Sequence, residues 1–312
     1  MITFELTKEQ KLIQKTAKEF AGGELTDIAR DCDEEADTPK KMLDKASELG
    51  LANAAVPEAY GGIGMERSAV TSVLVCEELG YGCAGLASAI MAPTGFIQPL
   101  IDFGSDSQKE KYLPPYAGET FEPTAMALHE SHFTFDPTDL RTSAEQKGNK
   151  WILNGIKRLV PFGQSANHFL VIAKSGNGNG RLINSIRIGN SALCLGISRA
   201  VLEYSVPYAK DRIAFGEPIG KKQAIAFMLA DMHIETESMR ALVWKAASQL
   251  DQNVDATKAT TLAQYYVNKH AVRIADNGVQ IFGGHGYIRD YPLEMWLRNA
   301  RTLTVMEGFV AA

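Results

Sequence analysis

Cysteines are few in this sequence, and their spacing argues against a disulfide-stabilised protein. The four lie far apart, at Cys32, Cys76, Cys83 and Cys194. A disulfide framework or a structural zinc site needs closer, paired spacings. We therefore expect reduced thiols with a structural role, in a cytoplasmic protein.

A basic excess, a long apolar run and a leader segment are also missing. The formal net charge is −5, so a nucleic-acid-binding surface is not expected. No apolar run approaches the roughly 18 residues of a membrane helix, which predicts no integral membrane segment. The first residues, MITFELTKEQ, contain no basic stretch followed by an apolar one, and they are too acidic for a transit peptide.

The first third of the chain has the apolar spacing of helices. Residues 7–20 begin with Thr7 and Gln10 at capping-box spacing, and an apolar stripe follows. We expect a helical N-terminal domain over 1–122, in which the apolar residues of 86–101 include the lining of a pocket. Further helices are predicted at 40–50, 66–80, 86–102 and 106–118.

The pattern changes to short strands after GETFEP (118–123). Between two of them, KGNK at 147–150 is a hairpin turn signal. SGNGNG at 175–180 lacks the Lys-Ser/Thr of a phosphate-binding P-loop and is typical of a flexible turn. We expect a partial, barrel-like β-domain over 123–180, with strands at 124–129, 141–147, 150–160 and 167–174.

From Arg181 the chain again has a helical pattern. Asp255 is placed to cap one helix, and Gly283 and Gly284 are placed to end it. Long helices with short connections indicate a four-helix bundle over 181–312. The predicted fold is therefore mainly α with a small β-domain. The bundle helices are expected at 181–209, 222–250, 255–282 and 292–306.

Three motifs are candidates for binding, and each has a plainer interpretation. RIAFGEPIGKKQ (212–223) places an Arg beside an aromatic ring at a Gly turn, which suits a flat anionic ligand or simply connects two helices. QIFGGHGYIRDYP (280–292) has glycines that allow close approach to a phosphate, or that only end a helix. HESH (129–132) has two histidines but no further ligands, so a metal site is not expected.

In this order, the motifs resemble the acyl-CoA dehydrogenases. RIAFGEPIGKKQ, QIFGGHGYIRDYPLEMWLRNAR and MEG are similar to the C-terminal domain of that family, and PEAYGG (57–62), FGSDSQKEKYLP (103–114) and DLRTSAEQKGNKWILNGIK (139–157) extend the resemblance over nearly the whole chain. It implies an N-terminal helical domain, a middle β-domain and a four-helix bundle. It also implies FAD, an acyl-CoA substrate, an electron-transfer flavoprotein as partner, and a homodimer or homotetramer.

The resemblance gives roles to individual residues. Arg212, Phe215 and Gln223 match a motif that contacts the flavin nucleotide. Gln280, Gly283 and Gly284 match a stretch that receives the FAD pyrophosphate from a neighbouring subunit. Residues at the start of the bundle match the acyl-CoA site, namely Arg187 and Asn184.

Near the end of the chain, TVMEGFVAA (304–312) contains a lone carboxylate, Glu307, in an apolar run. By itself it is typical of a frayed terminus, but the resemblance implies the catalytic base that removes the α-proton of an acyl thioester. Burial among apolar groups such as Met306 and Phe309 is expected to raise its pKa toward the operating pH. Hydride then leaves the β-carbon for flavin N5, which gives a trans-2-enoyl thioester.

Four positions depart from the family pattern around the flavin. His129 replaces a flavin-contacting Thr, Phe135 a Ser, Leu159 a Trp and Phe309 a Thr. His129 or nearby backbone N–H groups are expected to serve the flavin edge instead. The departures leave open a non-catalytic binding or assembly protein with an impaired flavin site, and a flavin enzyme of other chemistry, such as an oxidase.

The middle β-domain is also shorter than the family pattern, because several strands are missing between Gly180 and Arg181. Either the chain is internally shortened, or a disordered segment separates these residues in the intact protein. The clean match of both flanks favours the second interpretation. An intact mass well above that of the 312 residues would support it.

Overall fold

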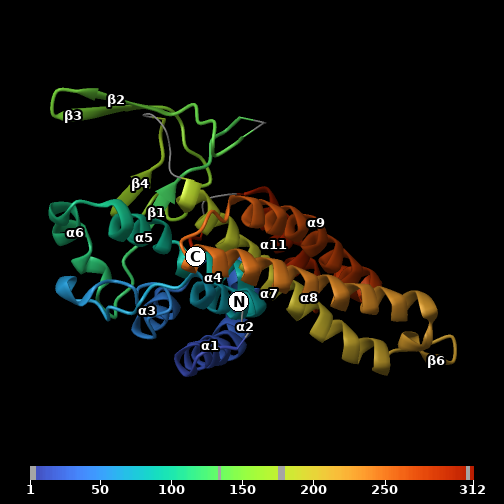
Figure 1. Cartoon of the computed structure of the whole chain (residues 1–312). Helices are drawn as coiled ribbons and strands as arrows, with labels where there is room; N and C mark the ends of the chain where they lie inside the picture. The colour runs from blue at the N-terminus through green and yellow to red at the C-terminus, as the bar shows by residue number, and fades with distance from the viewer. Residues whose placement is uncertain (1–4, 133–134, 175–179, 307–309) are drawn as a thin grey trace.

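Figure 1 shows a computed structural model of the chain, which describes residues 5–132, 135–174, 180–306 and 310–312. Helices form the first part, short strands follow from Thr124, and long helices form the rest from Gly180. The β-part and the small β5–β6 hairpin lie at opposite ends of the helical bundle. This separation divides the candidate site residues into two groups.

The N-terminal part is helical, as predicted. The capping box is confirmed: the Gln10 backbone N–H donates to Thr7 Oγ1 and the Thr7 N–H to Gln10 Oε1, both at 3.1 Å. The helices are α1 (Lys8–Phe20), the π-helical η1 (Ala21–Leu25), α2 (Thr26–Glu35), α3 (Lys40–Glu48), the 3-10 turn η2 (Glu58–Tyr60), α4 (Ala69–Met91), α5 (Thr94–Phe103), α6 (Asp106–Tyr112) and the 3-10 turn η3 (Pro114–Tyr116).

Two predictions in this part were wrong in detail. The helix predicted at 66–80 is confirmed as the first part of α4, which is interrupted at the non-helical Cys83 (φ −163°, ψ 111°), but the helix predicted at 86–102 is divided between the end of α4 and α5, which begins after Pro93. The helix predicted at 106–118 ends at Tyr112, because Pro114 and the proline after it have no N–H to continue it. Helix α2 was not predicted.

The strands are β1 (Thr124–Ala127), β2 (Ser143–Lys147), β3 (Lys150–Asn154) and β4 (His168–Val171). The predicted turn is confirmed, because β2 and β3 pair antiparallel with Lys147 opposite Lys150. β1 pairs with β4 in parallel. The strand predicted to run to residue 160 ends at Asn154, and the next residue, Gly155, lies so close to Thr142 that a Cβ on it would be 2.3 Å from Thr142 Oγ1.

The four long bundle helices are confirmed. They are α7 (Gly180–Asp211), α8 (Gln223–Asp251), α9 (Thr257–Phe282) and α11 (Leu293–Val305), with β5 (Ile213–Ala214), β6 (Glu217–Pro218), the 3-10 turn η4 (Ile219–Lys221) and the short α10 (Gly284–Tyr287) between them. The predicted cap is wrong in detail, because the N-cap of α9 is Ala256 and Asp255, one residue earlier, accepts from the Thr257 N–H through Oδ1 at 3.0 Å.

The N-terminal helices and the bundle share one core, in which α4 packs along α7. The two helices approach closely: a Cβ on Gly196 would lie 2.3 Å from the Glu77 carbonyl oxygen, and one on Gly80 would lie 2.5 Å from that of Leu193.

Helix α4 is long and apolar enough to cross a membrane, but its apolar stretch is 78% buried, which fits a core helix. All four cysteines are free and buried.

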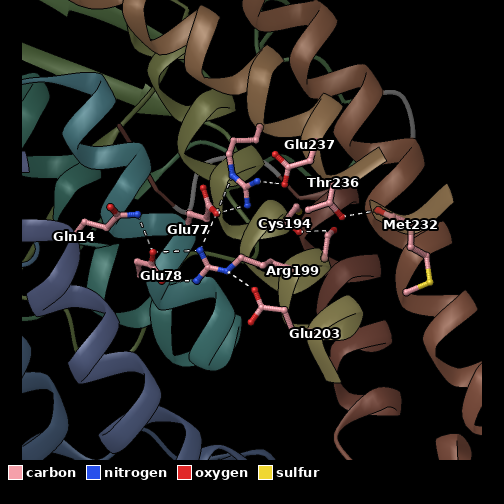
Figure 2. Close-up of polar contacts among 11 residues, drawn as sticks. Gln14, Glu77, Glu78, Cys194, Arg199, Glu203, Met232, Thr236 and Glu237 are labelled. Atoms are coloured by element: carbon pink, nitrogen blue, oxygen red, sulfur yellow. Dashed lines mark hydrogen bonds and ion pairs between the residues drawn. The ribbon is translucent and has the colours of Figure 1, made fainter. Parts of the chain in front are cut away.

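Buried charged side chains lie where α4 packs against α7 (Figure 2). Glu77 is 2% exposed and pairs with Arg199 of α7 and Arg240 of α8, each at 2.9 Å. Arg199 also pairs with Glu78, whose Oε1 accepts from Gln14 Nε2 of α1 at 3.0 Å. The ion pairs therefore join α4, α7 and α8, the Gln14 hydrogen bond adds α1, and each buried carboxylate has a charged partner.

Candidate functional site

The predicted site residues divide between the two ends of α7. Asn184 and Arg187 lie near its first residue, and Arg212 follows its last one. An α-helix rises 1.5 Å per residue, so Arg187 and Arg212 are separated by roughly 38 Å along the axis. One end of the bundle therefore carries the residues matched to the acyl-CoA site, and the other carries those matched to the FAD nucleotide.

The β5–β6 hairpin presents an aromatic ring and a cation. Its two turn residues, Phe215 (φ 54°) and Gly216 (φ 83°), are both left-handed, as a two-residue hairpin requires. The turn holds Phe215 96% exposed. Among the described residues, the exposed Arg212 side chain has no ion-pair partner. Gln223, also exposed, is the first residue of α8, just beyond the hairpin.

The end of α9 lies at the same end of the bundle. Phe282 stacks on Tyr208 of α7 with ring centroids 3.7 Å apart, and the Tyr208 hydroxyl is 3.0 Å from His285 Nδ1. Gly283 (φ 58°) and Gly284 follow, and a Cβ on either would meet no atom within 4 Å. Gln280 is exposed one turn earlier. Both glycines are therefore exposed with space beside them for a ligand, although the Gly283 N–H already donates to the Gln280 carbonyl oxygen at 3.1 Å.

At the opposite end, the last residues of the chain lie along α7. Asn190 Nδ2 donates to the Met306 carbonyl oxygen at 3.2 Å, and the Ala312 N–H donates to that of Ser185 at 3.1 Å. Glu307, like Phe309, lies outside the described residues. The residues on either side of 307–309 are therefore held on α7, next to the turn that carries Arg187.

The two residues predicted for substrate binding differ in their surroundings. Asn184 is buried, and its amide donates to Thr257 Oγ1 of α9 at 3.1 Å. Arg187 is half-buried and acts on Asp136, whose pKa is lowered by hydrogen bonds from Thr138 and, more weakly, by the Arg187 charge. Arg187 therefore lies between the β-part and the bundle, whereas Asn184 helps to join two bundle helices.

Two cavities adjoin the stretch predicted to line a pocket. One, of about 210 Å³, is lined in part by Met91, Thr94 and Gln98. Thr94 Oγ1 accepts from the Ala311 N–H at 3.1 Å, so this cavity reaches the C-terminal segment. The other, of about 500 Å³, is lined in part by Phe96 and Leu100 and lies against β4.

Comparison with known proteins agrees with this geometry. Residues 7–120 match the acyl-CoA dehydrogenase N-terminal domain, and 180–309 match the C-terminal domain. An acyl-CoA dehydrogenase of Bacillus subtilis is 30% identical, over 97% of this chain and 95% of its own. The chain belongs to the acyl-CoA dehydrogenase family. Enzymes of this family are FAD-dependent oxidoreductases that act on CH–CH bonds.

Two solved structures share the acyl-CoA dehydrogenase fold over almost their full length. Butyryl-CoA dehydrogenase from Megasphaera elsdenii has a TM-score of 0.86 and 28% identity, with 98% of this chain and 96% of that chain covered. A chain in a structure of the electron transferring flavoprotein of Acidaminococcus fermentans has a TM-score of 0.87 and 29% identity, with the same coverage.

The alignment with the Bacillus acyl-CoA dehydrogenase is consistent with a shortened middle β-domain in this chain. It spans 364 positions, more than the 312 residues of this chain, so the relative has residues without a counterpart here. Within the described part of the chain, β3 pairs only with β2 and leaves Trp151 56% exposed. The predicted shortening of the β-domain fits both observations, and 175–179 of the SGNGNG stretch lie outside the described residues.

The acyl-CoA dehydrogenase residues at the hairpin end fit FAD. The exposed Arg212 guanidinium suits the pyrophosphate, the exposed Phe215 ring offers a flat surface, and Gly283 and Gly284 leave space beside the backbone. At the other end, His129 packs on Phe135, with ring centroids 4.5 Å apart. Leu159, 57% exposed in the left-handed conformation, lies where the family pattern has a Trp.

Glu130 was not predicted, because the signal of the HESH motif lies in its two histidines and not in the carboxylate between them. Glu130 is 3% exposed, and Lys157 Nζ donates to its Oε1 at 2.9 Å. Burial alone raises the pKa of Glu130, but hydrogen bonds from Thr142, Lys157 and Arg141 outweigh it and hold the pKa at about 2. No cluster of three or more metal-ligating side chains occurs in the described parts of the chain.

Proposed function

We propose that this chain is an FAD-dependent acyl-CoA dehydrogenase that converts an acyl thioester to the trans-2-enoyl thioester, with Glu307 as the α-proton base. The observation that carries the proposal is the position of the C-terminal segment. Met306 and Val310–Ala312 lie along the same turns of α7 that carry Arg187. Family membership supports the chemistry, and the contacts of Met306 and Val310–Ala312 with α7 support the role of Glu307, because these residues lie on either side of 307–309.

Different residues of the chain have different roles in the proposed reaction. Glu307 takes the α-proton, and Arg187 places a positive charge beside the thioester site, where it favours an anionic substrate. Bound FAD supplies the acceptor for the β-hydride. Arg212 and the exposed turn at Gly283 and Gly284 would hold the cofactor pyrophosphate, and the Phe215 ring would offer the nucleotide a flat surface.

We propose that a second copy of the chain completes each site. Within one chain, Arg187 and Arg212 are separated by roughly 38 Å along α7. A site in which the flavin lies near Arg187 and the pyrophosphate near Arg212 is therefore built most simply from two copies, as a dimer or tetramer. In the same proposal, the protein is cytoplasmic and an electron-transfer flavoprotein reoxidises it.

Mixing two inactive variants tests this arrangement. Glu307→Gln removes the base, and Arg212→Glu reverses the charge at the nucleotide site. In a mixed dimer, one of the two sites combines the intact base of one copy with the intact hairpin of the other. Random pairing of co-expressed variants is therefore expected to restore about a quarter of the wild-type rate of flavin reduction by acyl-CoA.

Each variant expressed alone serves as the control and is expected to give a residual rate only. Co-expressed variants that show no more than the sum of these two rates would contradict the sharing of the site between copies. The base assignment itself is tested separately by Glu307→Gln alone.

A further inference from the structure

Two left-handed residues distort the loop after β3. Leu159 (φ 54°) and Phe162 (φ 51°) are not glycines, and such backbone persists only where the surrounding structure holds it. One end of the loop is held by Phe162, whose ring packs on Phe121 with centroids 5.4 Å apart. The other end begins at Lys157. Strained backbone that is firmly held is common at binding sites. The contacts of Lys157 decide how firmly the start of this loop is held.

Lys157 is held by a buried carboxylate. Glu130 Oε1 accepts from Lys157 Nζ and from the Thr142 N–H, both at 2.9 Å. Its Oε2 accepts from the Arg141 N–H at 2.7 Å and lies 3.6 Å from His132 Nδ1. Lys157 Nζ also donates to the Leu128 carbonyl oxygen at 2.9 Å. One ion pair therefore joins the end of β1, the start of β2 and the loop after β3.

The same ion pair fixes His129 relative to Leu159. Glu130 and Lys157 form an antiparallel bridge, and the Arg158 N–H donates to the His129 carbonyl oxygen at 2.9 Å. His129 and Leu159 are thus the immediate chain neighbours of residues locked in one network. Leu128 packs in a cluster with Ile186 and Ala311, so this network adjoins the segment that brackets residue 307.

We propose that Glu130 and Lys157 are a positioning pair that sets the wall formed by His129 and Leu159 against the flavin of FAD. The proposal rests on the proposed function, because the wall has a role only if FAD binds. Both side chains are buried, so we expect the pair to act through its neighbours rather than by direct contact with FAD. Its loss therefore changes how tightly and in what environment the flavin is held, beyond any change in stability.

Glu130→Gln tests the pair. An amide in place of the carboxylate loses the negative charge that attracts Lys157, so the hydrogen bond between the two side chains becomes weaker. The NH₂ group of the amide can also point at the N–H groups that donate to Glu130, and these cannot accept a hydrogen bond. We expect the dissociation constant for FAD, measured by equilibrium titration of the apoprotein, to rise roughly 10- to 100-fold. The visible absorption band of the remaining bound flavin is expected to shift. Asp139→Asn is the matched control, because Asp139 and Lys174 form an exposed pair at 3.8 Å in the same part of the chain.

A conservative rescue separates positioning from stability. Lys157→Arg keeps the charge and is expected to retain FAD affinity and the wild-type band, whereas Lys157→Met is expected to reproduce Glu130→Gln. If Glu130→Gln does not fold, the Lys157 variants decide the question by the same two readouts. Variants that lower the melting temperature but leave the FAD affinity and band unchanged would overturn the positioning role alone. A wild-type chain that binds no FAD would overturn both this role and the proposed function.

Discussion

Glu307→Gln is expected to leave FAD binding intact and to slow flavin reduction by acyl-CoA roughly 10²- to 10⁴-fold. Glutamine has the shape of glutamate but accepts no proton at neutral pH, so the α-proton has no acceptor. The measurement is anaerobic stopped-flow absorbance of the flavin band after mixing with acyl-CoA. A variant that reduces its flavin at a rate close to the wild-type rate would remove Glu307 from the role of base.

The control for this variant makes the same chemical change elsewhere. Glu24→Gln makes the same change from a carboxylate to an amide, but at an exposed residue of η1 rather than in the C-terminal segment. Its reduction rate is expected to match that of the wild type. Equal losses in both variants would indicate a general effect of the lost charge, and the base assignment would then fail.

Glu77→Ala is expected to lower the free energy of unfolding by about 3–5 kcal/mol. The substitution leaves Arg240 without its buried partner and removes one partner of Arg199, at the point where α4, α7 and α8 meet. Urea denaturation followed by circular dichroism measures the change.

The matched control is Glu19→Ala, which breaks an exposed pair with Lys15 at 3.7 Å, both side chains being 69% exposed. Exposed pairs contribute about 0–1 kcal/mol, so little change is expected there. A loss for Glu77→Ala as small as that of the control would show that the buried cluster does not join the helical domain to the bundle.

Local sequence patterns predicted the helices of this fold because each pattern is complete within its own segment. The apolar period and the Thr7–Gln10 capping box define α1 without reference to the rest of the chain. The parallel pairing of β1 with β4 joins residues 44 positions apart, and no local signal gives it. The close approach of Gly80 of α4 to Leu193 of α7 likewise joins residues far apart in the sequence.

The arrangement of the candidate site could likewise be predicted only in part from local sequence motifs. The motifs identified Arg212, Phe215 and the glycines one by one, but only the packing of Tyr208 on Phe282 places both motifs at one end of the bundle. The Glu130–Lys157 pair spans 27 positions and has no spacing rule. The position of Glu307 stays a prediction, because it lies outside the described residues.

The visible absorption spectrum of the purified wild-type protein with FAD tests the central claim most directly. It is recorded before and after anaerobic addition of a mixture of acyl-CoA thioesters. We expect a bound-flavin band that bleaches when the substrates are added. A chain that retains no flavin, or a bound band that no acyl-CoA bleaches, would contradict it. Either result would favour a non-catalytic member of the acyl-CoA dehydrogenase family.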